Sequence, residues 1–119
     1  MIAHFEQRLA TVRHRFSTTL ESKIADALSM VPHMTGADAG AVEQVAEAYR
    51  RVHAICGVAP TVGFAATGST ARAAEVVLLA AYLSHRGLTE SEAVSLRKAL
   101  GALHLAARSE LQAMYSRAM

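Results

Sequence analysis

Residues 41–56 read AVEQVAEAYRRVHAIC, and their apolar members recur three and four positions apart, at Val42, Val45, Tyr49, Val52 and Cys56. This spacing matches the period of an α-helix, so the stretch predicts an amphipathic helix with one apolar stripe. Successive residues turn by about 100° around a helix, which places His53 beside the stripe. We therefore expect the imidazole at the boundary of the core, within reach of solvent.

The residues that follow break local rules at one place. Residues 53–64 read HAICGVAPTVGF, so a glycine stands one turn after His53. Side chains on a helix lean toward its N-terminus, and a side chain at position 57 would cover the turn that carries His53. Gly57 leaves that space empty, although a glycine inside a helix costs roughly 0.5–1 kcal/mol relative to alanine. A local rule broken beside one titratable nucleophile points to a functional site.

This run resembles the histidine-containing phosphotransfer (Hpt) domain. The phosphorylated histidine of that family opens the pattern His-x-[Leu/Ile]-x-Gly-x-[Ala/Ser]-x-x-x-Gly, often followed by Phe, and the matching residues are His53, Ile55, Gly57, Ala59, Gly63 and Phe64. Farther along, one branch of the family carries a glycine, an alanine and a glutamate on the next helix, at the places of Gly68, Ala71 and Glu75. The resemblance thus runs from residue 53 to residue 75.

Two residues depart from the family pattern. Cys56 stands where many members have a lysine, three residues after the histidine. Pro60 lies within the pattern, and a proline inside a helix costs about 3 kcal/mol because it removes a hydrogen-bond donor and crowds the preceding turn. We expect a kink or a helix end between Cys56 and Gly63.

The resemblance implies a phosphorelay intermediate. His53 would accept a phosphoryl group, through Nε2, from an aspartate of a response-regulator receiver domain and pass it to another receiver, and a hybrid sensor histidine kinase is a further implied partner. Mg²⁺ would be bound by the receiver, so no cofactor or metal is expected on this chain. The expected docking and access residues surround His53 and are Arg50, Gly57, Ala46, Ala54 and Pro60.

Composition limits the other function classes. The chain has 119 residues, 52% of them hydrophobic, and a formal charge of +2, which suits one all-α domain over residues 1–119. The basic residues form no stripe with interleaved aromatic residues, so nucleic-acid binding is not expected. The sequence has neither a signal-peptide pattern nor a run of roughly 20 apolar residues, so we expect a cytoplasmic protein that does not associate with membranes. The resemblance implies a monomer.

Helical periodicity along the chain predicts an antiparallel four-helix bundle with a long N-terminal helix. The first helix should end before Pro32, and residues 17–19, all serine or threonine, are the place where it could break. The helix that carries His53 should span about 38–60, with Thr35 or Asp38 as its cap.

The second half of the chain predicts two more helices. The third, from Ala71 to about His85, has apolar residues around much of its circumference and should be mostly buried, with Gly87 as its stop. Thr89 and Glu92 have the spacing of a capping box and should begin the fourth.

Other residues with functional chemistry have weaker support. The remaining histidines include no pair three or four positions apart on a predicted helix: His4, His14, His33, His85 and His104. A metal site would therefore need ligands from separate helices. Arg50 could meet a phosphoryl group or an acidic partner, or could be a solvated helix arginine. Glu75 is expected to be a surface or helix-pairing carboxylate rather than a general base, and Cys56 a small buried residue.

Two alternatives to a relay protein stay open. One is a helical adaptor of the same fold that binds receivers or kinases without phosphotransfer, which Cys56 and Pro60 favour. The other is the dimerisation-type histidine hairpin of sensor kinases, which the glycine pattern after His53 disfavours. The chain is too short to include an ATP-binding kinase domain, so autokinase activity is not expected. The identity of the kinase, the receivers and the signal cannot be read from the sequence.

Overall fold

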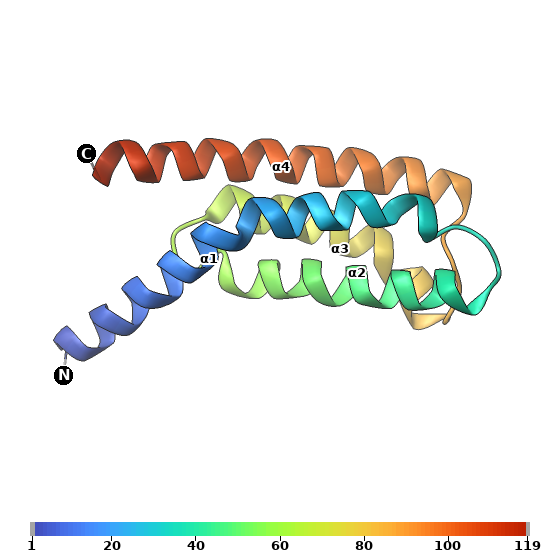
Figure 1. Cartoon of the computed structure of the whole chain (residues 1–119), viewed down its shortest axis with the longest axis horizontal. Coiled ribbons are helices and arrows are strands. Elements are labelled where there is room, and N and C mark those ends of the chain that lie inside the picture. Colours follow the sequence, from blue (N-terminus) through green and yellow to red (C-terminus); the bar gives the residue numbers. More distant parts are fainter. Residues whose placement is uncertain (1, 119) are drawn as a thin grey trace.

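The computed structural model describes residues 2–118, so the two terminal residues of the expected domain lie outside the description. Its elements, in chain order, are α1 (Ile2–Met30), the 3₁₀ turn η1 (Val31–His33), α2 (Ala39–Val58), α3 (Ala65–Leu83) and α4 (Glu90–Ala118). The four α-helices run alternately in opposite directions along one long axis (Figure 1). The expected antiparallel four-helix bundle with a long N-terminal helix is thereby confirmed.

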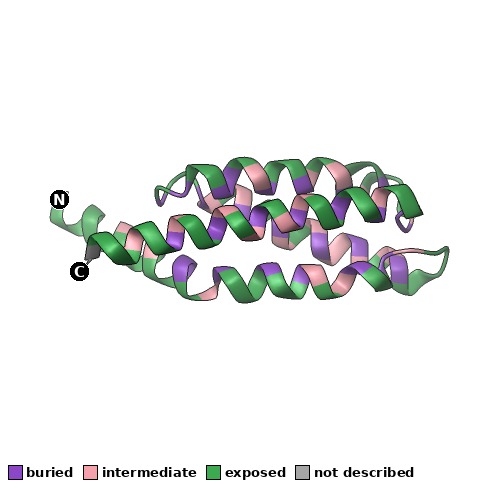
Figure 2. Cartoon of the chain, turned by 90° about the horizontal axis from the view of Figure 1, so that it is seen from above, coloured by how far each residue is buried: buried purple, intermediate pink, exposed green. Residues whose placement is uncertain are grey.

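One continuous core fills the space between the helices. Figure 2 shows its buried residues as a stripe along the inner side of each helix. The largest side chains that are fully buried include Leu20, Ile24, Val45, Val52, Leu78, Leu96, Leu100 and Leu103. Burying one such side chain stabilises the fold by about 1.5–3 kcal/mol. The apolar stripes of the four helices therefore supply much of the energy that holds the bundle together.

The first helix is continuous through the serine and threonine residues where a break seemed possible. The hydroxyls of Ser17, Thr18 and Thr19 donate to backbone carbonyls three or four residues earlier, at 3.0–3.1 Å. Such bonds bend a helix without ending it, and the first turns of α1 leave the line of the bundle in Figure 1. Two apolar side chains on these turns, Phe5 and Val12, are 66% and 43% exposed.

The helix that carries His53 begins and ends close to the expected positions. Asp38 is its cap, because a carboxylate oxygen accepts a hydrogen bond from the Ala41 backbone N–H at 2.8 Å. The helix ends at Val58, as expected for a chain that reaches Pro60 two residues later. A turn follows and closes at Gly63, whose φ of 88° lies in the left-handed region that favours glycine.

The predicted start of the third helix was wrong, because α3 begins at Ala65 and not at Ala71. The first backbone N–H groups of a helix need partners outside it. Here the Glu110 carboxylate of α4 accepts hydrogen bonds from the backbone N–H groups of Ala66 and Thr67, at 3.3 and 2.6 Å, and from the Thr67 hydroxyl at 2.7 Å. This cap comes from a distant part of the chain, so local sequence rules could not find it.

The predicted burial of the third helix was also wrong. Val76, Leu79 and Leu83 are 64%, 36% and 66% exposed, and Ala80 is exposed as well. The apolar residues of α3 occupy two sides of the helix, but the bundle covers only the side that carries Ala71, Ala74, Leu78 and Ala81. An apolar stripe is therefore left on the surface.

Gly87 was predicted to end α3, and this prediction was wrong. The helix ends at Leu83, and His85 takes the left-handed conformation with a φ of 51°, while the Arg86 N–H donates to the Ala81 carbonyl at 3.1 Å. Gly87 instead permits close packing, since a Cβ there would collide with the carbonyl oxygens of Gly36 and Met34.

The capping box of the fourth helix is confirmed. The Glu92 N–H donates to the Thr89 hydroxyl at 3.1 Å, and the Thr89 N–H donates to the Glu92 carboxylate at 2.9 Å. Within residues 2–118, no helix has the length and hydropathy needed to cross a membrane.

Candidate functional site

His53 lies in the C-terminal half of α2, on the side that faces α3. Its side chain is 64% exposed, whereas its neighbours Val52 and Ile55 are buried in the core. Helical periodicity alone thus placed the imidazole at the core boundary, and the structure agrees. A ring in this position can be reached by another protein while its backbone is held by the bundle.

Glu75 of α3 holds one side of the imidazole. A carboxylate oxygen of Glu75 lies 3.1 Å from Nδ1 of His53, and only 16% of the Glu75 side chain is exposed. The Cys56 thiol and the His53 imidazole, which face this carboxylate, lower the pKa of Glu75 although burial acts in the opposite direction. Glu75 is therefore ionised near neutral pH.

The ionised carboxylate decides which imidazole nitrogen carries the proton. A carboxylate only accepts hydrogen bonds, so Nδ1 of a neutral His53 must be the N–H donor. Nε2 then keeps its lone pair. Glu75 was predicted to be a surface or helix-pairing carboxylate; it joins α2 to α3 and thereby orients His53.

Tyr49 packs against the face of the imidazole from one helical turn earlier. The two ring centroids are 5.7 Å apart and the planes differ by 10°. The Tyr49 hydroxyl also donates to the Glu75 oxygen that faces His53, at 3.4 Å. Burial and the Glu75 charge raise the pKa of Tyr49, so its hydroxyl stays protonated. The spacing of apolar residues along the chain indicates only that Tyr49 belongs to the apolar stripe.

Cys56 lies beside the same carboxylate and is half-buried. Burial, with a further contribution from Glu75, raises the pKa of the Cys56 thiol to about 12. A thiol with such a pKa is protonated at neutral pH and is a poor nucleophile. His53 is thus the better nucleophile of the two.

Gly57 leaves open space next to the histidine turn. Apart from its chain neighbours and the backbone of α2 itself, a Cβ added there would meet no atom of the described residues within 4 Å. Gly68 differs, because a Cβ at that position would come within 3.1 Å of Pro60 Cγ. Gly57 therefore leaves the surface open, while Gly68 lets α3 approach the end of α2.

The other expected docking residues lie at different depths around His53. Ala54 and Pro60 are exposed, whereas Ala46 is half-buried. Residues 46, 50 and 57 share the angular sector of His53, but Ala54 is turned about 100° away from it. Ala54 therefore faces outward from α2 on the side away from α3.

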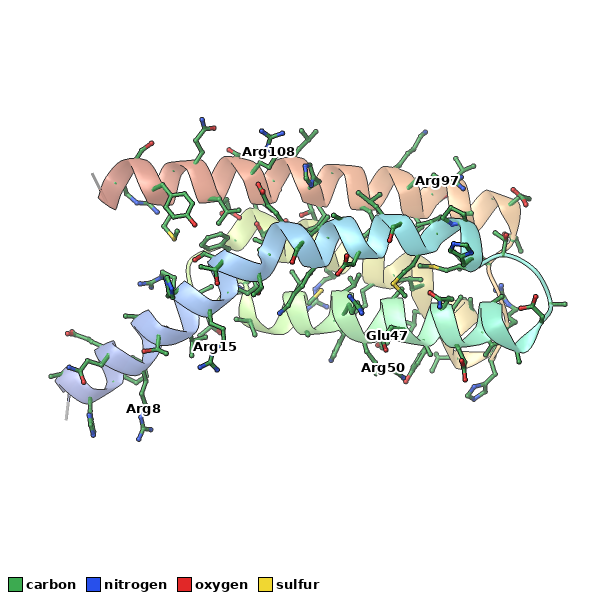
Figure 3. The ribbon with its side chains drawn as sticks, in the orientation of Figure 1. Arg8, Arg15, Glu47, Arg50, Arg97 and Arg108 are labelled. Atoms are coloured by element: carbon green, nitrogen blue, oxygen red, sulfur yellow. The ribbon has the colours of Figure 1, made fainter. Side chains whose placement is uncertain are left out.

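Arg50 is exposed but already has an acidic neighbour. Its guanidinium lies 3.1 Å from the Glu47 carboxylate, which also accepts from Arg51 at 3.0 Å. Arg51 and Arg50 together lower the pKa of Glu47. Figure 3 shows the Arg50 and Glu47 side chains together at the outer side of α2. The pair is exposed and should contribute little to stability.

The exposed apolar stripe of α3 begins next to Glu75, the residue that contacts His53. Val76 follows Glu75 directly, and Leu79 is one helical turn farther along. Residues 76, 79 and 83 share one face of the helix because they are spaced three and four apart. We call these three residues, together with the exposed residues Arg50 and Gly57 of α2 and Pro60 in the turn after it, the histidine face. The sequence pattern did not reveal the α3 part, because apolar residues around much of the circumference predicted a mostly buried helix.

The remaining histidines are not brought together. Within residues 2–118, no three His, Cys, Asp or Glu side chains form a group that could hold a metal ion.

Comparisons with protein-family models, with curated proteins and with solved structures gave no match for this chain.

Proposed function

We propose that this protein is a histidine phosphotransfer module that carries a phosphoryl group on Nε2 of His53. The observation that supports it best is the 3.1 Å contact between Glu75 and Nδ1, which leaves the other nitrogen of an exposed ring with its lone pair. The proposed origin in the Hpt family rests on the pattern from His53 to Glu75.

The proposed chemistry needs few groups from this chain. The Nε2 lone pair attacks the phosphorus of an aspartyl phosphate, the P–O bond to the aspartate breaks, and the aspartate leaves as a carboxylate with the bonding electrons. The Nδ1 proton stays in place, so the phosphorylated imidazole is cationic and faces the Glu75 carboxylate. In-line phosphoryl transfer depends mainly on positioning and charge stabilisation. Mg²⁺ would be supplied by the receiver.

The proposed partner is a receiver domain that docks on the histidine face. Its acidic pocket must close over His53, so the residues around the ring come within contact distance. Gly57 adds no side chain there, and the α3 stripe offers apolar area next to the ring. A transient interface at the small end of the size range suits a relay that must release its product. We place this relay in the cytoplasm and propose that the chain acts as a monomer.

An adaptor that binds receivers without accepting phosphate is the second candidate. Two observations favour it: the position three residues after His53 carries the neutral thiol of Cys56, and the nearby Arg50 is paired with Glu47. Such a protein would use the same histidine face but would have no need of Nε2.

Two phosphate donors test the proposal. The protein would be incubated with phosphoramidate, which phosphorylates histidine directly, and with a receiver domain charged on its aspartate by acetyl phosphate. We expect the charged receiver to place acid-labile phosphate on wild type and on the control His85→Gln, but not on His53→Gln. From phosphoramidate, which can reach other exposed histidines, we expect His53→Gln to take up less phosphate than wild type. Acid-labile phosphate on His53→Gln at the wild-type level would show that another residue is the acceptor. Receiver binding without phosphate transfer to wild type would support the adaptor.

A further inference from the structure

Three aromatic rings form a parallel stack that ends on His53. The centroids of Tyr82 and Tyr49 are 4.1 Å apart with planes within 9°, and Tyr49 stacks in turn on the imidazole at 5.7 Å. Tyr82 and Tyr49 are half-buried, whereas His53 is exposed. The stack therefore fixes one face of the imidazole against the protein and leaves the opposite face free.

Stacking on Tyr49 has an electrostatic consequence when the imidazole gains charge. The face of a tyrosine ring carries negative potential, and a cation within about 6 Å of the ring centroid is attracted to it. Attack by Nε2 on phosphorus makes the imidazole cationic because Nδ1 keeps its proton. The cationic ring would then lie between two stabilising groups, the Glu75 carboxylate at its edge and the Tyr49 ring at its face.

Tyr49 is also well placed to keep this arrangement. Its hydroxyl lies 3.4 Å from the Glu75 oxygen that contacts Nδ1, and Tyr82 packs against its other face. Rotation of the Tyr49 ring would disturb the stack with Tyr82 and the contact with Glu75. Tyr49, which fixes the plane of the imidazole, is thus itself fixed by its contacts with Glu75 and Tyr82.

We propose that Tyr49 is a positioning residue whose ring face stabilises the positive charge that develops on His53 during phosphorylation. This inference rests on the proposed function of His53. It gives the Tyr49 ring an electrostatic role in addition to its packing between α2 and α3.

The test varies the electrostatics of the ring while its shape stays nearly constant. Tyr49 is replaced by phenylalanine and, through noncanonical incorporation, by pentafluorophenylalanine, whose ring face has reversed polarity. Phosphate uptake from phosphoramidate is followed by ³¹P NMR, and folding is checked by thermal unfolding. We expect the fluorinated variant to take up phosphate about two- to fivefold more slowly than Tyr49→Phe, the size of an exposed cation–π interaction. The same pair of replacements at Tyr115 of α4, which is 51% exposed, should leave the rate unchanged.

The outcomes separate this inference from the proposed function. Equal uptake rates for the two Tyr49 variants, with both folded, would overturn the role of the Tyr49 ring and leave phosphate acceptance by His53 intact. No uptake by wild type, from phosphoramidate or from a charged receiver, would overturn both. Slower uptake in the fluorinated Tyr115 variant would show that fluorination acts through the fold, which would also contradict the inference.

Discussion

The carboxylate of Glu75 lies 3.1 Å from Nδ1 of His53, although 22 positions separate the two residues and they belong to different helices. This contact converts an exposed histidine into one with a defined tautomer. It also connects α2 to α3 at the place where a partner would dock.

Glu75→Gln should slow phosphate uptake by roughly tenfold or more. A glutamine amide can donate to Nδ1, which would move the proton to Nε2 and remove the attacking lone pair. The substitution also removes a hydrogen bond to a charged group, a kind of bond that contributes about 1.5–3 kcal/mol. Uptake from phosphoramidate measures the effect, and ¹⁵N chemical shifts of the imidazole report the tautomer. Glu47→Gln removes a carboxylate from α2 away from the ring and should change neither.

Adding a side chain at Gly57 should separate access from stability. Gly57→Ala should be neutral or stabilising by up to about 1 kcal/mol, because its Cβ meets open space. Gly57→Leu should lean toward the histidine turn and slow transfer from a charged receiver several-fold. Gly101→Leu on α4 is the control, since a Cβ there also meets open space. If Gly57→Leu transfers at the wild-type rate, this glycine does not provide access.

Val76→Ser should weaken receiver docking. Val76 is 64% exposed in the free chain, and burying its side chain in an interface would contribute about 1 kcal/mol, or roughly fivefold in affinity. Titration of a receiver, followed by NMR, measures the change. Leu105→Ser on α4, where Leu105 is 69% exposed, should bind like wild type. Equal affinities of the two variants would place the docking surface elsewhere.

Arg50→Glu should slow transfer several-fold at low salt, with the difference narrowing as salt is added. The substitution replaces a charge that balances Glu47 with a second acid, so the face of α2 would repel the acidic pocket of a receiver. Transfer rates at two salt concentrations provide the measurement. Arg97→Glu on α4, far from Arg50 in Figure 3, serves as the control for net charge. A deficit of Arg50→Glu that did not respond to salt would argue against electrostatic steering.

Stability should fall in acid partly through Glu92. The Arg86 guanidinium and the Thr89 N–H lower the pKa of Glu92 from 4.5 to about 2. A lowered pKa means that the contribution is complete above pH 4.5 and is lost as pH falls toward 2. We expect Glu92→Gln to destabilise the fold by about 1–2 kcal/mol at neutral pH. This value is smaller than the pKa shift alone would give, because Arg86 is partly exposed and solvent screens its charge. Urea unfolding at pH 7 and pH 3 should show the difference from wild type shrinking in acid; a constant difference would contradict this account.

Several parts of the fold followed from local patterns. The periodicity of residues 41–56 placed His53 at the edge of the core, and Pro60 predicted a kink or a helix end between Cys56 and Gly63, of which the structure has the helix end. Asp38, one of the two predicted caps of α2, and the capping box of Thr89 and Glu92 were found because capping depends on residues three positions apart. Such features involve neighbours along the chain, so the sequence alone determined them, together with the choice of an all-α bundle.

Other features depended on residues that are distant in sequence. The start of α3 was set by Glu110, which lies 43 positions beyond Thr67. Glu75 and Tyr49 meet at His53 because α2 and α3 pack side by side, and the α3 stripe stays exposed because the bundle covers only one side of that helix. Periodicity reports which residues share a helix face, but only packing decides which face is covered and which carboxylate meets which ring. The tertiary structure therefore decided the candidate site, whereas the sequence had determined its helix and its histidine.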